Sequence, residues 1–268
     1  MEQEYDNVQR LWQSFHIRDV DALDDALQSF CILFAYHSGK IENEKIDYHD
    51  VREIFENGRV LNYSGDIQTL LEQHNQKLCH DFLRERIVAK EPLTLALIRE
   101  IHGILTADTY DEKRYIARGE RPGAFKKHDY VTGIHEVGYP PEQVEDALTE
   151  LLDEISSHES DKDPLLTAAY FHARFETIHP FADGNGRVGR TLMNYYLMSR
   201  DYPPVIIHDE DKKAYYDALE QYDADENIHP LRRFIMAQAI KTWDRQMERT
   251  MGRQPDRKGL KDFMCDQK

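Results

Sequence analysis

Hydrophobic residues recur at three- and four-residue steps along most of the chain, which is the spacing of amphipathic α-helices. The clearest example follows Pro140 and Pro141, where Val144, Leu148 and Ile155 fall on one helix face. The same spacing predicts further helices over residues 67–82, 93–105, 163–177, 192–198, 209–223 and 230–249. The pattern therefore predicts an all-α fold.

Residues 119–138 form the one stretch that favours β-structure. They are rich in Gly, Lys, His, Tyr, Val and Thr, and Pro122-Gly123 and Gly133 supply turn residues. This composition predicts a short β-hairpin rather than a helix. Residues 251–268 lack an apolar stripe, so we expect a loosely packed C-terminal tail.

The charge of the chain excludes some classes of partner. The 268 residues include 34 Lys and Arg against 50 Asp and Glu, which gives a formal net charge of −16. Binding to a nucleic-acid polymer or to an anionic membrane surface requires a basic face, so we expect neither. The charge is uneven, however, because residues 113–127 hold six bases and one acid. A single nucleotide therefore remains a compatible ligand.

The sequence also predicts a reducing, cytoplasmic environment. The three cysteines contain no CxxC pair, so neither a disulfide framework nor a cysteine zinc site is supported. The acidic N-terminus does not resemble a signal peptide. The longest apolar run, residues 30–36, is too short to span a bilayer.

Residues 179–190 read HPFADGNGRVGR and concentrate the chemistry of the chain between two predicted helices. The glycines allow close backbone approach to a ligand, and a helix that begins there offers free N–H groups to an anion. Arg187 and Arg190 project from one helix face toward that anion. Asp183 suits a hard cation such as Mg²⁺, and His179 can accept a proton near neutral pH. Together these groups suit a magnesium-bound nucleoside triphosphate that is attacked by a hydroxyl.

Other interpretations of this segment are weaker. The Asp-Gly-Asn-Gly part on its own also fits a plain tight turn. An EF-hand is excluded because its twelfth position, counted from Asp183, is Asn194 rather than Glu. The chain contains neither a Walker A loop nor an HExxH zinc motif.

At these residues the chain resembles the Fic family, whose signature H-x-F-x-[DE]-G-N-G-R-x-x-R is matched at every defined position. The resemblance extends over residues 93–240 and implies a Fic-type helical bundle. It implies a catalytic core at 93–250, preceded by an N-terminal helical region at 1–92. In such proteins a flap hairpin, here residues 119–138, aligns a segment of the target protein by strand addition.

The resemblance further implies an adenylyltransferase that uses Mg²⁺ and moves AMP from ATP onto a Ser, Thr or Tyr hydroxyl. The hydroxyl would belong to another protein or to the chain itself. His179 would be the general base, and Asp183 would hold Mg²⁺. The implied nucleotide-binding residues are Gly184, Asn185, Gly186, Arg187 and Arg190, with Tyr216 against the adenine.

A second motif lies upstream of this core. Residues 38–43 match the inhibitory pattern [ST]-x-x-x-E-[GN] of the family, with Ser38, Glu42 and Asn43 at the defined positions. They follow an apolar helical run at residues 27–34. The match implies that Glu42 pairs with Arg190 and competes with a γ-phosphate for its guanidinium group.

Several alternatives stay open at the level of sequence. The same loop and Glu42 could instead remove AMP from a modified protein, and another nucleotide-type donor could replace ATP. A toxin-like module controlled by a partner antitoxin is a further interpretation, although an inhibitory motif within the chain makes a separate inhibitor less necessary. Many relatives self-associate, so a homo-oligomer is also an open expectation.

Overall fold

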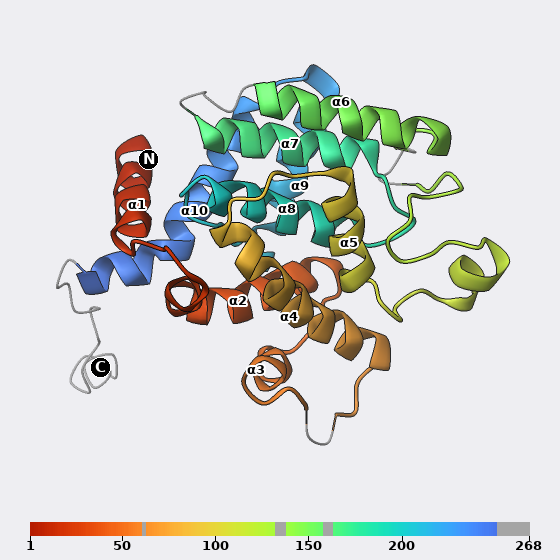
Figure 1. The fold of residues 1–268 in the computed structure, drawn as a ribbon, viewed down its shortest axis with the longest axis horizontal. Coiled ribbons are helices and arrows are strands. Elements are labelled where there is room, and N and C mark those ends of the chain that lie inside the picture. Colours follow the sequence, from red (N-terminus) through yellow and green to blue (C-terminus); the bar gives the residue numbers. More distant parts are fainter. Residues whose placement is uncertain (61–62, 132–137, 158–162, 251–268) are drawn as a thin grey trace, which may run out of the picture.

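A computed structural model describes residues 1–60, 63–131, 138–157 and 163–250 (Figure 1). Within these ranges the fold is all-α and contains no strand. The helices are α1 (Glu2–Ser14), α2 (Val20–Glu42), α3 (Tyr48–Asn57), α4 (Ile67–Val88), α5 (Leu95–Leu105), α6 (Val144–Ser157), α7 (Pro164–Ile178), α8 (Asn185–Ser199), α9 (Lys212–Asp225) and α10 (His229–Thr250). Short helical turns are η1 (Lys113–Ala117), η2 (Pro141–Gln143) and η3 (Asp209–Asp211).

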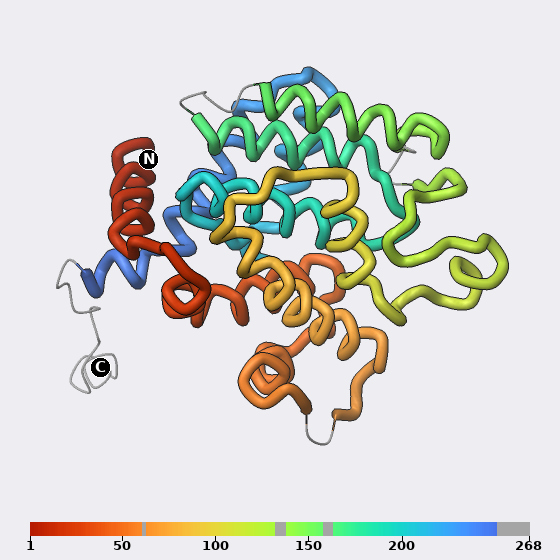
Figure 2. Tube along the Cα trace, in the orientation of Figure 1, coloured from red at the N-terminus to blue at the C-terminus, as the bar shows by residue number. Residues whose placement is uncertain are grey.

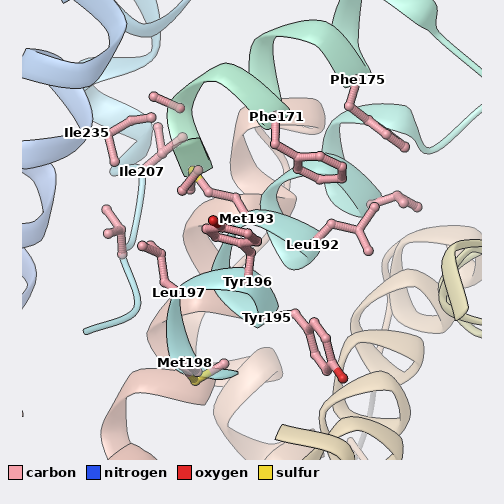
Figure 3. Packing of buried hydrophobic residues seen from close by; sticks show 14 of the residues in the cluster. Phe171, Phe175, Leu192, Met193, Tyr195, Tyr196, Leu197, Met198, Ile207 and Ile235 are labelled. Carbon is pink, nitrogen blue, oxygen red and sulfur yellow. The ribbon is translucent and has the colours of Figure 1, made fainter. Parts of the chain in front are cut away.

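Helix α8 is the centre of the fold. It packs against α2, α4, α5 and α7, and all of its residues except Gly186 are buried. In the tube view, α6 and α7 lie on one side of α8, with α2 and α4 on the other (Figure 2). Leu192 and Met193 of α8 pack near Phe171 and Phe175 of α7 (Figure 3). Burial of such side chains stabilises the fold by about 1.5–3 kcal/mol each.

The predicted helices are confirmed, and the structure adds α1 and α3. Helix α1 packs on α10, where the rings of Trp12 and Trp243 lie 5.4 Å apart. The apolar core is continuous from α1 to α10, so residues from 1–92 and 93–250 share it. The predicted tail at 251–268 lies outside the described residues.

The predicted hairpin is wrong for residues 119–131, which form turns and irregular structure, while residues 132–137 lie outside the described residues. The buried carboxylate of Glu120 organises residues 120–130 by contacts within the segment. It accepts hydrogen bonds from the backbone N–H of Lys127 at 3.1 Å, from His128 at 2.9 Å and from the Tyr130 hydroxyl at 3.1 Å. One backbone donor of this stretch, the Lys127 N–H, is therefore bonded to a side chain rather than to a partner strand.

Among the described residues, no helix is both long enough and apolar enough to cross a membrane. Cys31 and Cys79 are buried free thiols, and Cys265 lies outside the described residues.

Candidate active site

Two residues in the left-handed region shape the loop between α7 and α8. His179 ends α7 with φ 51°, and its N–H donates to the Phe175 carbonyl at 3.0 Å. Gly184 begins α8 with φ 80°, and a Cβ at this position would lie 2.7 Å from Cγ2 of Thr106. Only glycine fits this second position without strain. The chain therefore leaves one helix at His179 and enters the next within six residues of loop and cap.

The side chain of Asn185 holds the loop from within. It accepts a hydrogen bond from the Phe181 N–H at 2.9 Å and donates one to the Phe181 carbonyl at 2.8 Å. Asn185 was expected to form part of an anion cradle, the set of groups that would bind the phosphates of a nucleotide. In the structure its amide group binds the loop backbone, so its part in a cradle falls to its main chain.

A buried histidine that the sequence analysis did not single out supports the same loop. The ring of His102 in α5 stacks on Phe181 with centroids 3.7 Å apart. Its Nδ1 accepts from the Gly123 N–H at 2.8 Å, which leaves Nε2 to donate to the Asp183 carbonyl at 3.1 Å. Burial lowers the pKa of His102 to about 3, so the ring stays neutral. A lone histidine in an apolar helix gives no sequence signal of this role.

The loop and the first turn of α8 line a pocket of about 480 Å³. The opposite wall comes from the end of α2, the start of α4 and the η1 segment. The lining residues are Glu42, Asn43, Asp66, Gln68, Thr69, Glu72, Arg114, Tyr130, Val131, His179, Ala182, Asp183, Gly184, Asn185, Gly186 and Arg187. The structure thus brings most of the predicted site residues to one cavity. Tyr216 is not among the lining residues, and its side chain is partly exposed.

The segment around His179 is fixed by the chain on either side of residues 132–137. Lys126 donates its backbone N–H to the Pro180 carbonyl at 2.9 Å, and Tyr139 donates to the Ile178 carbonyl at 3.0 Å. Burial and the nearby Lys126 ammonium lower the pKa of His179 to about 4. His179 is therefore neutral at physiological pH and can accept a proton.

Asp183 projects a partly exposed carboxylate into the pocket. Its Oδ1 accepts from the Gly184 N–H at 2.8 Å, and its Oδ2 lies 3.5 Å from Nη1 of Arg114 in η1. A carboxylate oxygen open to the pocket is the hard donor that Mg²⁺ prefers. The residues present therefore fit a magnesium ion at Asp183.

Arg190 is almost completely buried and is held by α2. Its Nε donates to the Ser38 hydroxyl at 3.0 Å, and its Nη2 donates to the Ser38 carbonyl at 3.0 Å and to Oε1 of Glu42 at 2.7 Å. Burial by itself would raise the pKa of Glu42, but the charge and hydrogen bond of Arg190 hold it below the ordinary value. Glu42 is therefore ionised and paired, which is the contact predicted from the sequence.

The carboxylate of Glu42 also lies against the first turn of α8. A Cβ on Gly186 would be 2.6 Å from its Oε1, so the close approach requires glycine. The N-terminus of a helix attracts anions, and here a carboxylate of the same chain occupies that place. Asn43 ends α2 and fixes its end, since its Nδ2 donates to the Thr69 hydroxyl of α4 at 2.9 Å.

Arg187 has a carboxylate partner that the sequence analysis missed. Its Nη1 lies 3.3 Å from Oε1 of Glu72 in α4, and its Nη2 lies 3.9 Å from Oδ1 of Asp183.

Behind α8, Nε2 of His172 lies 2.7 Å from the Tyr215 hydroxyl. His172 is fully buried and supports the core.

Residues 92–197 match the Fic/DOC family. Protein adenylyltransferase Fic from Drosophila persimilis is 31% identical over 218 residues, which cover 78% of this chain and 39% of that protein. The homologue from Drosophila melanogaster is also 31% identical over 218 residues, with 40% of that protein covered. The chain thus spans about two fifths of the length of these curated relatives.

Solved structures show the same fold. A Fic-domain-containing signalling protein from Bacteroides thetaiotaomicron superposes with a TM-score of 0.78 at 24% identity, covering 94% of this chain and 100% of that chain. Fic-1 from C. elegans superposes with a TM-score of 0.74 at 23% identity, covering 94% and 73%. The fold is therefore a Fic-type helical fold. Residues 92–197 therefore belong to the Fic/DOC family, and the chain is a distant homologue of protein adenylyltransferase Fic.

Proposed function

We propose that this protein is an adenylyltransferase that moves AMP from ATP to a Ser, Thr or Tyr hydroxyl of a protein. The observation that carries the proposal is that His179, Asp183 and the first turn of α8 line one pocket. That pocket combines a neutral base, a cation ligand and an anion-binding helix terminus. The similarity to proteins named protein adenylyltransferase supports the same reaction.

In this reaction His179 takes the proton from the target hydroxyl. The hydroxyl oxygen forms a bond to the α-phosphorus of ATP, the bond from that phosphorus to the β-phosphate oxygen breaks, and pyrophosphate leaves. The backbone N–H groups of Asn185 and Gly186, which follow Gly184 at the start of α8, and the guanidinium of Arg187 would bind the phosphates as charge moves to the leaving group. Magnesium held by Asp183 would supply further neutralisation of phosphate charge.

Glu42 would restrain this activity. It occupies Arg190 with a charge-assisted hydrogen bond and lies over Gly186, where an incoming phosphate would also bind. Ser38 strengthens the restraint with two further contacts to Arg190. ATP could bind with Glu42 in place, but its outer phosphates would be misplaced for in-line attack. The enzyme would therefore be autoinhibited.

The test is incubation of the purified protein and its Glu42→Gly variant with Mg²⁺ and ATP labelled either at the α- or at the γ-phosphate. AMP transfer predicts that label from the α-position becomes attached to protein and that label from the γ-position does not. Adding His179→Ala should abolish the labelling, whereas His49→Ala, at an exposed histidine of α3, should preserve it. Attachment of the γ-label would instead indicate phosphorylation and would refute the proposal.

A further inference from the structure

The two signature arginines of α8 are each paired with a carboxylate from a different N-terminal helix. Arg190 is held by Glu42 of α2 at 2.7 Å, and Arg187 lies 3.3 Å from Glu72 of α4. Both pairs sit beside the same pocket, which Glu42, Glu72 and Arg187 line. Only the first pair corresponds to the inhibitory motif at residues 38–43.

The Arg187–Glu72 pair is buried but incompletely bonded. Only 5% of the Arg187 side chain and 11% of the Glu72 side chain are exposed. The Nε and Nη1 atoms of Arg187 are buried and make no hydrogen bond within the described part of the chain. Since buried donors without partners are costly, Arg187 retains unused capacity for an anion with better geometry.

Glu72 is itself in an unfavourable place for a charge. Burial raises its pKa above the ordinary value, against the opposing effect of Arg187. Gln68, one turn earlier in α4, donates from Nε2 to its Oε1 at 3.3 Å. A carboxylate in this position neutralises Arg187 and presents negative charge to any polyanion in the pocket.

We propose that Glu72 is a second restraining carboxylate of the phosphate site. It neutralises Arg187 from α4 as Glu42 neutralises Arg190 from α2, and it opposes the binding of a nucleotide polyphosphate. The ligand class rests on the proposed function, whereas the Arg187–Glu72 pairing does not. Removing Glu42 alone therefore leaves Arg187 paired with Glu72.

Glu72→Gln tests the proposal, because it removes the charge and retains the size and the oxygen that accepts from Gln68. The matched control is Glu85→Gln, the same change at an exposed position of α4. Dissociation constants for ATP, ADP and AMP, each with Mg²⁺, are measured by calorimetry for the parent, both single variants, Glu42→Gly and the Glu42→Gly/Glu72→Gln double variant.

We expect Glu72→Gln to tighten ATP binding about tenfold in either background, as loss of one close like charge in a partly buried site suggests. ADP should gain as well, AMP should gain little, and Glu85→Gln should have no effect. Unchanged or weaker ATP binding in Glu72→Gln, or an equal gain for AMP, would overturn the proposal. Failure of every variant to bind ATP would refute the proposed function instead.

A second measurement covers loss of stability in the variant. Without Glu72, Arg187 is a buried charge with little compensation, and a bound polyphosphate would restore its partner. The rise in thermal midpoint caused by saturating Mg²⁺-ATP should therefore be larger in Glu72→Gln than in the parent or in Glu85→Gln. An equal or smaller rise would contradict the inference even if the unliganded variant is less stable.

Discussion

Glu42 and Arg190 are 148 positions apart in the sequence, and a hydrogen bond of 2.7 Å joins them directly above Gly186. The pair links the end of α2 to the first turns of α8. Because a guanidinium group cannot give the same donors to a carboxylate and to a phosphate at once, a phosphate that bound Arg190 would compete with Glu42.

The first prediction concerns this competition. Glu42→Gly should raise AMP transfer at least tenfold, because it frees Arg190 for the outer phosphate, and tenfold requires a bias of only about 1.4 kcal/mol. The measurement is incorporation of α-labelled adenylate. Glu44→Gly, the same change at an exposed glutamate two residues on, is the control and should leave the rate unchanged. Equal rates for parent and Glu42→Gly across several ATP and Mg²⁺ concentrations would refute the inhibitory role.

The second prediction is the pH dependence of the transfer. The pKa of His179 is lowered from 6.5 to about 4 by burial and by Lys126. The base must be neutral, so kcat/KM of Glu42→Gly should stay level as pH falls from 8 to 5 and decline only near pH 4. Removing the Lys126 charge in Lys126→Met should move that decline to higher pH. A decline of kcat/KM near pH 6.5 in Glu42→Gly would contradict this assignment.

The third prediction concerns the loop. Asn185→Asp should lower the free energy of unfolding by about 2–3 kcal/mol, because a carboxylate cannot donate to the Phe181 carbonyl and leaves it buried without a partner. Denaturant unfolding measures the change. Asn227→Asp is a suitable control, since Asn227 only accepts, from the His229 N–H, and Asp can do the same. Identical unfolding midpoints for parent and Asn185→Asp would show that the amide bridge contributes nothing.

The fourth prediction is acid destabilisation through His172. Burial, with a smaller effect of Arg190, lowers its pKa from 6.5 to about 3. Between pH 3 and 6.5 the unfolded state therefore binds more protons, so this residue's contribution is complete above pH 6.5 and is lost as pH falls. At pH 4.5 the loss is about 3 kcal/mol. His172→Gln should reduce the slope of unfolding free energy against pH in this window by the amount that corresponds to at most one bound proton. An unchanged slope would contradict the assignment of this effect to His172.

The sequence predicted what depends on local pattern. Helical spacing located α6, α7 and α8, and the contiguous segment 179–190 located the loop. The pairing of Glu42 with Arg190 followed from two motifs matched to a family. Glu72 and His102 carried no such signal. From sequence alone, a glutamate or histidine that pairs with a distant residue cannot be distinguished from any other glutamate or histidine in a helix.

The error at residues 119–131 has a similar origin. Strand-forming composition there was a correct observation, but one buried carboxylate, Glu120, accepts the Lys127 backbone N–H and binds the side chains of His128 and Tyr130. Tyr216 was placed by analogy with the family alone, and its ring lies beside Tyr215 with centroids 5.1 Å apart rather than among the residues that line the pocket.

The near-complete burial of α8 has an evolutionary consequence. A substitution in α8 disturbs the interior of the protein. The chemistry of the residues that α8 contributes to the site can therefore change only slowly in evolution. The carboxylates that pair with the arginines of α8 stand on α2 and α4. Glu42 is partly exposed, so a change there alters a charge with little effect on the interior, whereas Glu72 is buried and a change there costs more. Under the proposed restraint, selection would reset the threshold at which such a protein becomes active, one carboxylate at a time, while the reaction itself is inherited unchanged.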